Sequence, residues 1–441
     1  MFDNEEEKLA KWKRAIEKTD APQDKLEWAI QQGFQRAKNA QKMTKRPYVK
    51  RGIWSLVAAV ILVIAFATSI RVSPAIANAV AALPGMEKIV HLIQDNKGLM
   101  SAIDNEYYQA LQVSAEKEGI TLTIDGVIAD DQEIVIFHTV KGASKYASFP
   151  LLVPELLDTE GNIIAESVSA MSDSEEIDGG TVQTTGRSHI RFIDGFDGNE
   201  FILKATIKSQ SRTIDYEIPF SLIKEKMPTT RYPINETVAI EGQKVTIQHI
   251  EISPVKVSVH VKMDPENTME IFAFEDLRLV DDKGETWTSI SDGVVAMSPA
   301  EHEEIIYLQS NYFEQPTTLT LMINRLQALA KEEAYIVVDT EKGVILEQPA
   351  DQRFSVSHLT DKSIEFSLRG EKGYSSLPFL SGFIDAEGRE FDESGGVYRK
   401  ESDELIKISE VFPDEPFVNP IKLPLVSYPQ WIEGEVKIKI K

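Results

Sequence analysis

The side chains of this chain that could take part in metal or acid–base chemistry are its seven histidines and its many carboxylates. The chain has no cysteine, which excludes disulfides, thiol catalysis and Cys-ligated zinc. The histidines are scattered singly, and no two have the sequence spacing of metal ligands. Four of them fall in or beside predicted strands, where we expect an edge or solvent-facing position: His138, His249, His260 and His358.

One acidic run has the composition of a calcium-binding loop, because it combines oxygen ligands with glycine. It reads Asp194-Gly195-Phe196-Asp197-Gly198-Asn199-Glu200. The run lacks the residue order and the distant glutamate of an EF-hand, so a solvated hairpin loop is the default expectation. The chain also lacks the G-x-S-x-G, G-x-x-x-x-G-K-[ST] and H-E-x-x-H motifs. We therefore predict that the protein is not an enzyme, and we predict no catalytic, cofactor or metal site.

The elements that hold these side chains are organised around one uncharged segment of nineteen residues, Gly52 to Ile70. A helix of that length spans roughly 28 Å, about the thickness of the hydrocarbon core of a bilayer. Seven Lys and Arg residues lie in the twenty positions before the segment, but only Arg71 and Lys88 in the twenty after it. The positive-inside rule therefore predicts a single-pass membrane protein with a cytoplasmic N-terminus and an extracellular C-terminal ectodomain.

A cleaved signal peptide is the alternative interpretation of residues 52–70. Ala75-Ile76-Ala77 and Ala77-Asn78-Ala79 have the small-x-small spacing of a cleavage site. A signal peptide has a short basic start and an apolar core of roughly 7–15 residues. Here about fifty residues precede a longer core, which favours an uncleaved anchor.

Charge is distributed unevenly on the two sides of the predicted span. Residues 1–51 carry a net charge of +5 and Arg71 adds one positive charge. Residues 72–441 carry −29, which brings the net charge of the chain to −23. So acidic an exterior argues against nucleic acid or an anionic membrane surface as its ligand. We expect an extracellular ligand whose identity the sequence does not reveal.

The cytoplasmic segment, residues 1–51, reads as two short amphipathic helices. Two helices of this size bury too little apolar surface to be stable alone, so we expect a partner to cover their apolar faces. Asp3, Glu5, Glu6 and Glu7 make the first helix a poor binder of anionic lipid, which favours a protein partner. The predicted partner-binding residues are Leu9, Trp12, Ile16, Leu26, Ile30 and Phe34.

Beyond the span, a helical pattern over 86–111 predicts a juxtamembrane stalk or a helix packed on the first outer domain. A period of two follows from Glu118. Three segments then share the order strand, turn, strand and an Asp-x-x-Gly turn, which ends at Gly161, Gly284 and Gly388. A closing strand is predicted after each, at Phe201, Thr318 and Gly434, and a helix is predicted over 324–333. Three matches in one order predict tandem antiparallel β-sandwich (Ig-like) modules.

The predicted fold class is therefore mainly β, preceded by a single transmembrane helix and a short helical cytoplasmic segment. The predicted parts are a cytoplasmic segment (1–51), the transmembrane helix (52–70), a helical stalk (71–118) and three β-sandwich modules (119–230, 231–343 and 344–441).

Part of the chain resembles a bacterial family. Ser69–Leu99 (SIRVSPAIANAVAALPGMEKIVHLIQDNKGL) and Asp104–Phe137 (DNEYYQALQVSAEKEGITLTIDGVIADDQEIVIF) resemble domain of unknown function 4179. Residues 228–345 are similar to the companion domain of unknown function 5643. Such proteins resemble transmembrane regulators of extracytoplasmic-function sigma factors in Gram-positive bacteria. The family supplies no catalytic or binding residues, and the His-x-x-x-Cys-x-x-Cys motif of zinc-containing anti-sigma factors is absent here.

The resemblance implies an anti-sigma-like regulator whose cytoplasmic helices bind a sigma factor. Its ectodomain would sense a ligand or stabilise the regulator. The alternative from another class is a cell-envelope structural or adhesion protein with Ig-like binding modules, in which the N-terminal segment is only an anchor. An extracellular hydrolase is the third reading, and the absence of catalytic motifs argues against it.

Overall fold

A computed structural model describes residues 86–143, 151–165, 167–177, 181–192, 195–209, 212–290, 296–371, 374, 376–379, 382–391, 396–402 and 404–441. The chain divides into two compact parts, Met1–Pro74 and Ala75–Lys441, and every described residue belongs to the second part. The predicted cytoplasmic segment, the predicted span and the six predicted partner-binding residues lie outside the described residues. Within the described part of the chain, no helix combines the length and apolar character needed to cross a bilayer.

The helical pattern predicted over 86–111 is broken in the structure. Two short helices form instead, α5 (Met86–Ile93) and α6 (Lys97–Asp104). The break occurs at Asn96, which caps α6 because its side-chain oxygen accepts a hydrogen bond from the Leu99 backbone N–H at 3.1 Å. From Gln109 the chain is a strand, because its backbone groups pair with the next segment instead of closing helical turns.

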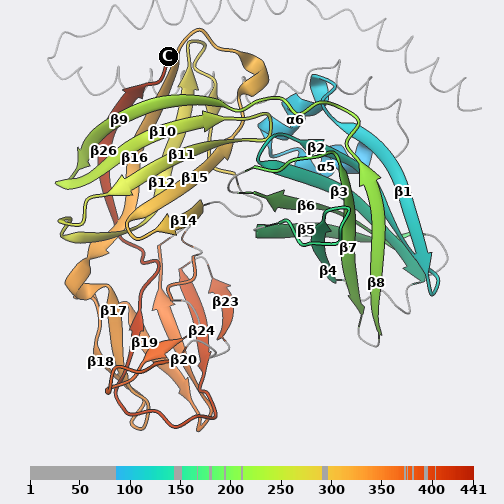
Figure 1. Ribbon diagram of the computed structural model, residues 1–441. Coiled ribbons are helices and arrows are strands. Elements are labelled where there is room, and N and C mark those ends of the chain that lie inside the picture. The colour runs from blue at the N-terminus through green and yellow to red at the C-terminus, as the bar shows by residue number, and fades with distance from the viewer. Residues whose placement is uncertain are drawn as a thin grey trace, which may run out of the picture. The chain divides into compact units, whose positions relative to one another are not determined.

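The first pair of sheets follows the helices (Figure 1). One sheet has the order β1-β2-β3-β6-β5 and the other the order β4-β7-β8. They share one apolar core, to which Leu122 and Ile136 contribute from the first sheet and Leu203 and Tyr216 from the second. The strands are β1 (Gln109–Lys117), β2 (Ile120–Ala129), β3 (Glu133–Ala143), β4 (Leu151–Leu157), β5 (Ser167–Ile177), β6 (Thr181–Arg191), β7 (Glu200–Ser209) and β8 (Arg212–Ser221).

The second pair of sheets has the orders β14-β15-β11-β10-β9 and β13-β12-β16-β26. Its core contains Val259 from one sheet and Leu321 from the other. The strands are β9 (Thr230–Ile240), β10 (Gln243–Ile252), β11 (Lys256–Met263), β12 (Met269–Asp281), β13 (Thr286–Trp287), β14 (Ala296–Ala300), β15 (Glu303–Gln309), β16 (Leu319–Ala330) and β26 (Trp431–Lys439), with a 3-10 turn at Tyr312–Glu314.

The third pair of sheets has the orders β18-β17-β25-β21-β22 and β19-β20-β24-β23, and Phe366 and Leu423 meet in its core. The strands are β17 (Tyr335–Asp339), β18 (Val344–Glu347), β19 (Phe354–Leu359), β20 (Ser363–Arg369), β21 (Phe383–Ile384), β22 (Glu390–Phe391), β23 (Gly396–Ser402), β24 (Leu405–Val411) and β25 (Ile421–Pro424). The chain is thus mainly β with several antiparallel sheets, as the sequence predicts.

Each pair of sheets forms one repeat unit, and these are called the first, second and third units. The predicted Asp-x-x-Gly turns have the same hydrogen bonds in all three units. In the second, the Asp281 carboxylate accepts bonds from the backbone N–H groups of Lys283 (2.9 Å) and Glu285 (2.7 Å), and Gly284 has a φ of +79°. The turns that end at Gly161 and Gly388 repeat these contacts, with φ values of +89° and +82°. This φ range favours glycine because it has no Cβ.

Strand order confirms the repeat. In each unit a hairpin (β2–β3, β10–β11 and β19–β20) precedes the strand before the Asp-x-x-Gly turn (β4, β12 and β21), which joins the other sheet. After the turn, two strands return to the hairpin's sheet (β5–β6, β14–β15 and β23–β24). In the second and third units a short strand that pairs with the turn strand comes before them (β13 and β22). A closing strand (β7, β16 and β25) then pairs beside the turn strand. The three glycines therefore occupy corresponding hairpin bends.

Two predictions in this region are wrong. The predicted helix 324–333 is the end of strand β16 followed by a 3-10 turn at Lys331–Glu333, because β16 is paired along its length with β12 on one side and β26 on the other. The strand predicted to close the third unit, from Gly434, is part of β26, which pairs with β16 in the second unit instead. The short strand β25 closes the third unit.

Candidate functional site

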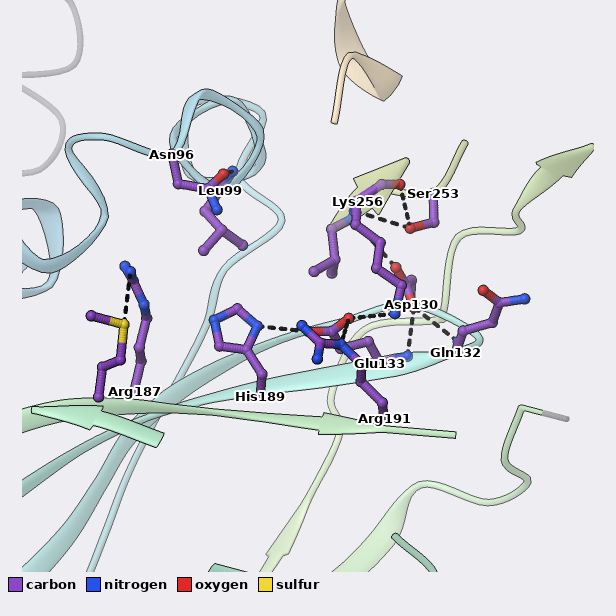
Figure 2. A network of polar contacts seen from close by, with 12 residues as sticks. Asn96, Leu99, Asp130, Gln132, Glu133, Arg187, His189, Arg191, Ser253 and Lys256 are labelled. Atoms are coloured by element: carbon purple, nitrogen blue, oxygen red, sulfur yellow. Dashed lines mark hydrogen bonds and ion pairs between the residues drawn. The ribbon is translucent and has the colours of Figure 1, made fainter. Parts of the chain in front are cut away.

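The candidate site lies where corresponding hairpin turns of the first and second units meet (Figure 2). The turn between β2 and β3 contains Asp130 and leads into Glu133, and the turn between β10 and β11 leads into Lys256. The Lys256 ammonium donates to the Glu133 carboxylate at 2.5 Å, and the Val255 backbone N–H donates to the Asp130 carboxylate at 3.3 Å. Residues that are more than 120 positions apart in the sequence thus form one polar cluster.

Asp130 shapes the first of these turns. Its carboxylate accepts hydrogen bonds from the backbone N–H groups of Gln132 (2.8 Å) and Glu133 (2.7 Å), and its own N–H donates to the Glu133 carbonyl at 3.0 Å. The residue is fully buried, and burial raises the pKa of its carboxyl group even though Lys256 opposes this. Its hydrogen bonds offset part of the cost of that burial.

Glu133 is the centre of the buried cluster. Its carboxylate contacts the His189 Nδ1 at 2.6 Å, the Arg191 Nε at 3.1 Å and the Lys256 Nζ at 2.5 Å. Strand register produces this arrangement, because Glu133 on β3 is opposite Arg191 on β6 and is diagonal to His189. Burial alone would raise the pKa of Glu133, but Lys256 and Arg191 hold it well below its usual range.

The two cations of this cluster share an aromatic neighbour. The Arg191 guanidinium carbon lies 5.0 Å from the centroid of the Tyr307 ring, and the Lys256 Nζ lies 4.9 Å from it. At this distance the ring attracts a cation through its quadrupole. Tyr307 is on β15, opposite Ser258, on the face of that sheet that points away from the second core.

Further along the same face lies a group of potential metal ligands. His249 and Glu251 are two residues apart on β10, and His260 on β11 is directly opposite His249. The His249 Nε2 lies 3.7 Å from one Glu251 carboxylate oxygen, and the His260 Nε2 lies 3.6 Å from the other. The two imidazole rings are stacked, with centroids 3.8 Å apart and planes 23° apart.

The environment of this group sets its charge state. Burial, and then the neighbouring His260 and Arg231, lower the pKa of His249 to about 4. The interaction with His260 is the main reason that the pKa of Glu251 falls to about 2. Gln132 from the first unit donates to Glu251 at 3.2 Å, so the β2–β3 turn touches both this group and the buried cluster.

Helices α5 and α6 contact the second unit on another side. The Lys97 ammonium pairs with Glu285 and donates to the Thr286 carbonyl at 3.0 Å, and the Gln309 amide donates to the Asp95 carbonyl at 3.0 Å. Gly98 approaches the second unit so closely that a Cβ there would lie 2.6 Å from the backbone nitrogen of Ser310. Val255 also belongs to the apolar cluster of these helices.

The segment that connects the first unit to the second is also fixed by hydrogen bonds. The Tyr107 hydroxyl donates to the Ala129 carbonyl at 2.5 Å and accepts from the Met227 N–H at 2.8 Å. The Thr229 N–H donates to the Asp131 carboxylate at 3.1 Å. Polar contacts, an apolar cluster and the connecting chain therefore fix the helices and the first unit to the second.

The histidine predictions have mixed outcomes. His138 is buried, 1% exposed, against the predicted edge or solvent-facing position, because Gly186 opposite it on β6 leaves room for the ring. His358 is exposed as predicted. His249 and His260 are partly buried and form a pair, which their sequence separation hides. The short turn at Pro254 and Val255 sets the register that aligns them, and this was the signal available in the sequence.

The calcium-loop alternative receives no new support. Asp194 lies outside the described residues, and Gly195 and Gly198 have φ values of +75° and +81°, as in a tight loop. Among the described residues, the one group of three or more side chains placed to hold a metal ion is His249, Glu251 and His260.

Comparisons with known proteins match two segments of the chain. Residues 48–142 match the domain of unknown function DUF4179, and residues 229–368 match the family of unknown function DUF5643. No curated protein shows a significant match to the chain. A solved structure described as a conserved domain protein from Bacillus anthracis is 15% identical and has a TM-score of 0.38, over 54% of this chain and 84% of that one. This similarity is too low to bear on the fold.

Both family matches agree with the resemblance found in the sequence. The first covers the predicted span, the two helices, β1, β2 and most of β3, and the second runs from β9 to β20. The buried cluster therefore joins the two matched segments through Glu133 and Lys256. The chain carries a DUF4179 domain followed by a DUF5643 domain.

Proposed function

We propose that this protein is a single-pass membrane regulator resembling an anti-sigma factor, with residues 1–51 in the cytoplasm and residues 71–441 outside the cell. In this proposal the cytoplasmic helices bind an extracytoplasmic-function sigma factor and keep it from RNA polymerase. The three pairs of sheets act as Ig-like β-sandwich modules that sense a ligand or hold the regulator in its resting state.

The observation that carries the proposal is the attachment of α5 and α6 to the second unit. Only residues 71–85 separate these helices from the predicted span. Lys97, Gly98 and Gln309 bring the helices against the second unit, and Glu133 and Lys256 link it to the first. A rearrangement of the second unit would therefore act directly on the chain that leaves the membrane. A passive anchor has no need of such an attachment.

The test separates a regulator from an anchor through the first cytoplasmic helix. Trp12→Asp together with Ile16→Asp places charge on the predicted apolar face, so it should release the sigma factor and raise transcription from its promoters. Arg14→Asp is the matched control, since a residue two positions from Trp12 is about 200° around the helix. Transcription should stay at the wild-type level in this control.

Unchanged transcription in the double variant, with the protein present at normal abundance, would overturn the regulator and leave the envelope structural or adhesion protein as the reading. Topology is tested separately with alkaline phosphatase fusions. The enzyme should be active when fused after Val140 and inactive when fused after Ala40. The opposite pattern would overturn the proposed orientation.

A further inference from the structure

We propose that His249, Glu251 and His260 form a binding site for a divalent transition-metal ion of the zinc class. The site lies on the face of the β14-β15-β11-β10-β9 sheet that points away from the second core, because the residues that alternate with these three, Ile250 and Val259 among them, fill that core. Metal binding is independent of the proposed regulatory role, since it rests on these three side chains alone.

The spacing of the donor atoms suits a small metal ion. Bonds of 2.0–2.1 Å in a tetrahedral zinc site place neighbouring ligand atoms roughly 3.3–3.4 Å apart. The two histidine-to-glutamate separations are 3.7 and 3.6 Å, and all three donors lie within 4.8 Å of one another. The two histidine-to-glutamate gaps need movements of tenths of an ångström. The stacked imidazoles must also tilt so that their lone pairs converge on one point.

One of the three donors is not used in a close hydrogen bond. The His260 Nε2 is buried, and its contact with the Glu251 carboxylate oxygen, at 3.6 Å, is longer than a hydrogen bond. Buried polar atoms normally have such a bond, so this nitrogen is a candidate ligand for an ion.

The donor set selects the class of ion. Two imidazole nitrogens and one carboxylate oxygen suit Zn²⁺ and its first-row neighbours, whereas Ca²⁺ and Mg²⁺ prefer oxygen ligands throughout. The side chains of His249 and Glu251 are each 14% exposed and that of His260 is 20% exposed. The ion would therefore be partly shielded, with a fourth position left for water or a ligand.

Two neighbouring side chains adjust the site. Gln132 donates to Glu251 at 3.2 Å and fixes the orientation of the carboxylate, as residues behind metal ligands commonly do. Arg231 lies 3.7 Å from the same carboxylate and opposes a second cation, but its side chain is 61% exposed, so solvent screens its charge. Removal of Arg231 should therefore strengthen metal binding.

The experiment measures binding to the full chain in detergent micelles after all metal has been removed with a chelator. Isothermal titration with Zn²⁺ should give one tight site per chain, and Co²⁺ should give the visible absorption of a four-coordinate site with nitrogen ligands. His260→Ala and Glu251→Gln should each weaken Zn²⁺ binding about tenfold or more, while Arg231→Ala should strengthen it.

His358→Ala is the matched control. His358 occupies the strand of the third unit that corresponds to β10, follows a bulge as His249 does, and is exposed opposite Glu365. Its loss should leave Zn²⁺ affinity unchanged. Affinity that stays within twofold in both His260→Ala and Glu251→Gln, or an absence of saturable binding, would overturn the site.

A second readout needs no variant and so does not depend on variant folding. Zn²⁺ added to the wild-type chain should slow backbone hydrogen exchange in β10 and β11, because the ion would join these two strands. Exchange in β19 and β20 of the third unit should not change. Slowing that is equal in both hairpins, or absent from both, would count against the site.

Discussion

Glu133→Gln is the substitution whose consequence follows most directly from the structure. It preserves the shape of the side chain but removes the negative charge that faces Arg191 and Lys256. These three residues are 0%, 3% and 5% exposed, so the two cations would remain buried without the carboxylate that both of them contact. Loss of one partner from a buried ion pair costs about 3–5 kcal/mol. That cost falls on the junction of the first and second units.

The assay is hydrogen exchange of the full chain, followed by peptides from β3, β6 and β11. Each 1.4 kcal/mol is a factor of about ten in an equilibrium constant, so amides that exchange through opening of this junction should exchange roughly 10² to 10³·⁵ times faster. Peptides from β20 and β24 in the third unit are an internal control and should exchange as in the wild type.

Glu155→Gln is the matched control variant. Glu155 pairs with Lys204 at 2.7 Å on the first unit, but both side chains are 39% exposed. Exposed pairs contribute little to stability, so exchange should change only slightly. Lys256→Met added to a Glu133→Met variant should return exchange part of the way to the wild-type rate, because an apolar pair leaves fewer buried charges.

The effect of Glu133→Gln should also depend on pH. The native pKa of Glu133 lies well below its ordinary value of 4.5, so its contribution is complete above about 4.5 and is lost as pH falls through the native pKa. The difference between variant and wild type should therefore shrink in acid. Exchange within fivefold of the wild type at pH 7 in β3, β6 and β11 would refute the reasoning.

Three further substitutions test smaller features. Gly284→Ala should cost about 1 kcal/mol of stability from its φ of +79° alone, since nothing lies within 4 Å of the added Cβ. Gly126→Ala should cost more, because its Cβ would overlap the Gln109 carbonyl and the Tyr108 ring. Thermal unfolding that ranks the two variants in the reverse order would contradict this. Burial raises the pKa of Glu304 to about 7, so the free energy of unfolding should fall as pH rises from about 4.5 to 7. Glu304→Gln should remove this slope and be more stable than the wild type above pH 7 in chemical unfolding, and an unchanged slope would show that another group is responsible.

The sequence predicts the parts of this fold that local patterns encode. Alternating residues such as those of β20, and the Asp-x-x-Gly turns at Gly161, Gly284 and Gly388, report their structure within a few positions, because the period of the side chains and the backbone of the turn are local properties. Repeating those patterns predicts the hairpin and the turn of each unit, but not the strand that closes the third.

The sequence fails where distant partners decide the structure. Residues 324–333 carry good helix formers, yet pairing with β12 and β26 makes residues 324–330 part of a strand. From the sequence alone, Glu133 would be expected at the surface. The register of β3 and β6 and the turn before Lys256 place three basic side chains against it, those of His189, Arg191 and Lys256. His249 and His260 meet only because a short turn aligns them, so the candidate site could not be found from spacing along the chain.

The return of β26 to the second unit has a consequence for how the chain is made. Ile432 and Ile438 of β26 fill the core of the second unit, although they are translated after the whole third unit. The third unit is therefore an insertion within the second, and its two connections leave from adjacent positions, since Gln327 is opposite Trp431. During synthesis the second unit remains incomplete, with the edge of β16 unpaired, until β26 emerges. A premature stop within β26 would leave both matched segments in the chain, but the core of the second unit would lack the side chains that β26 supplies.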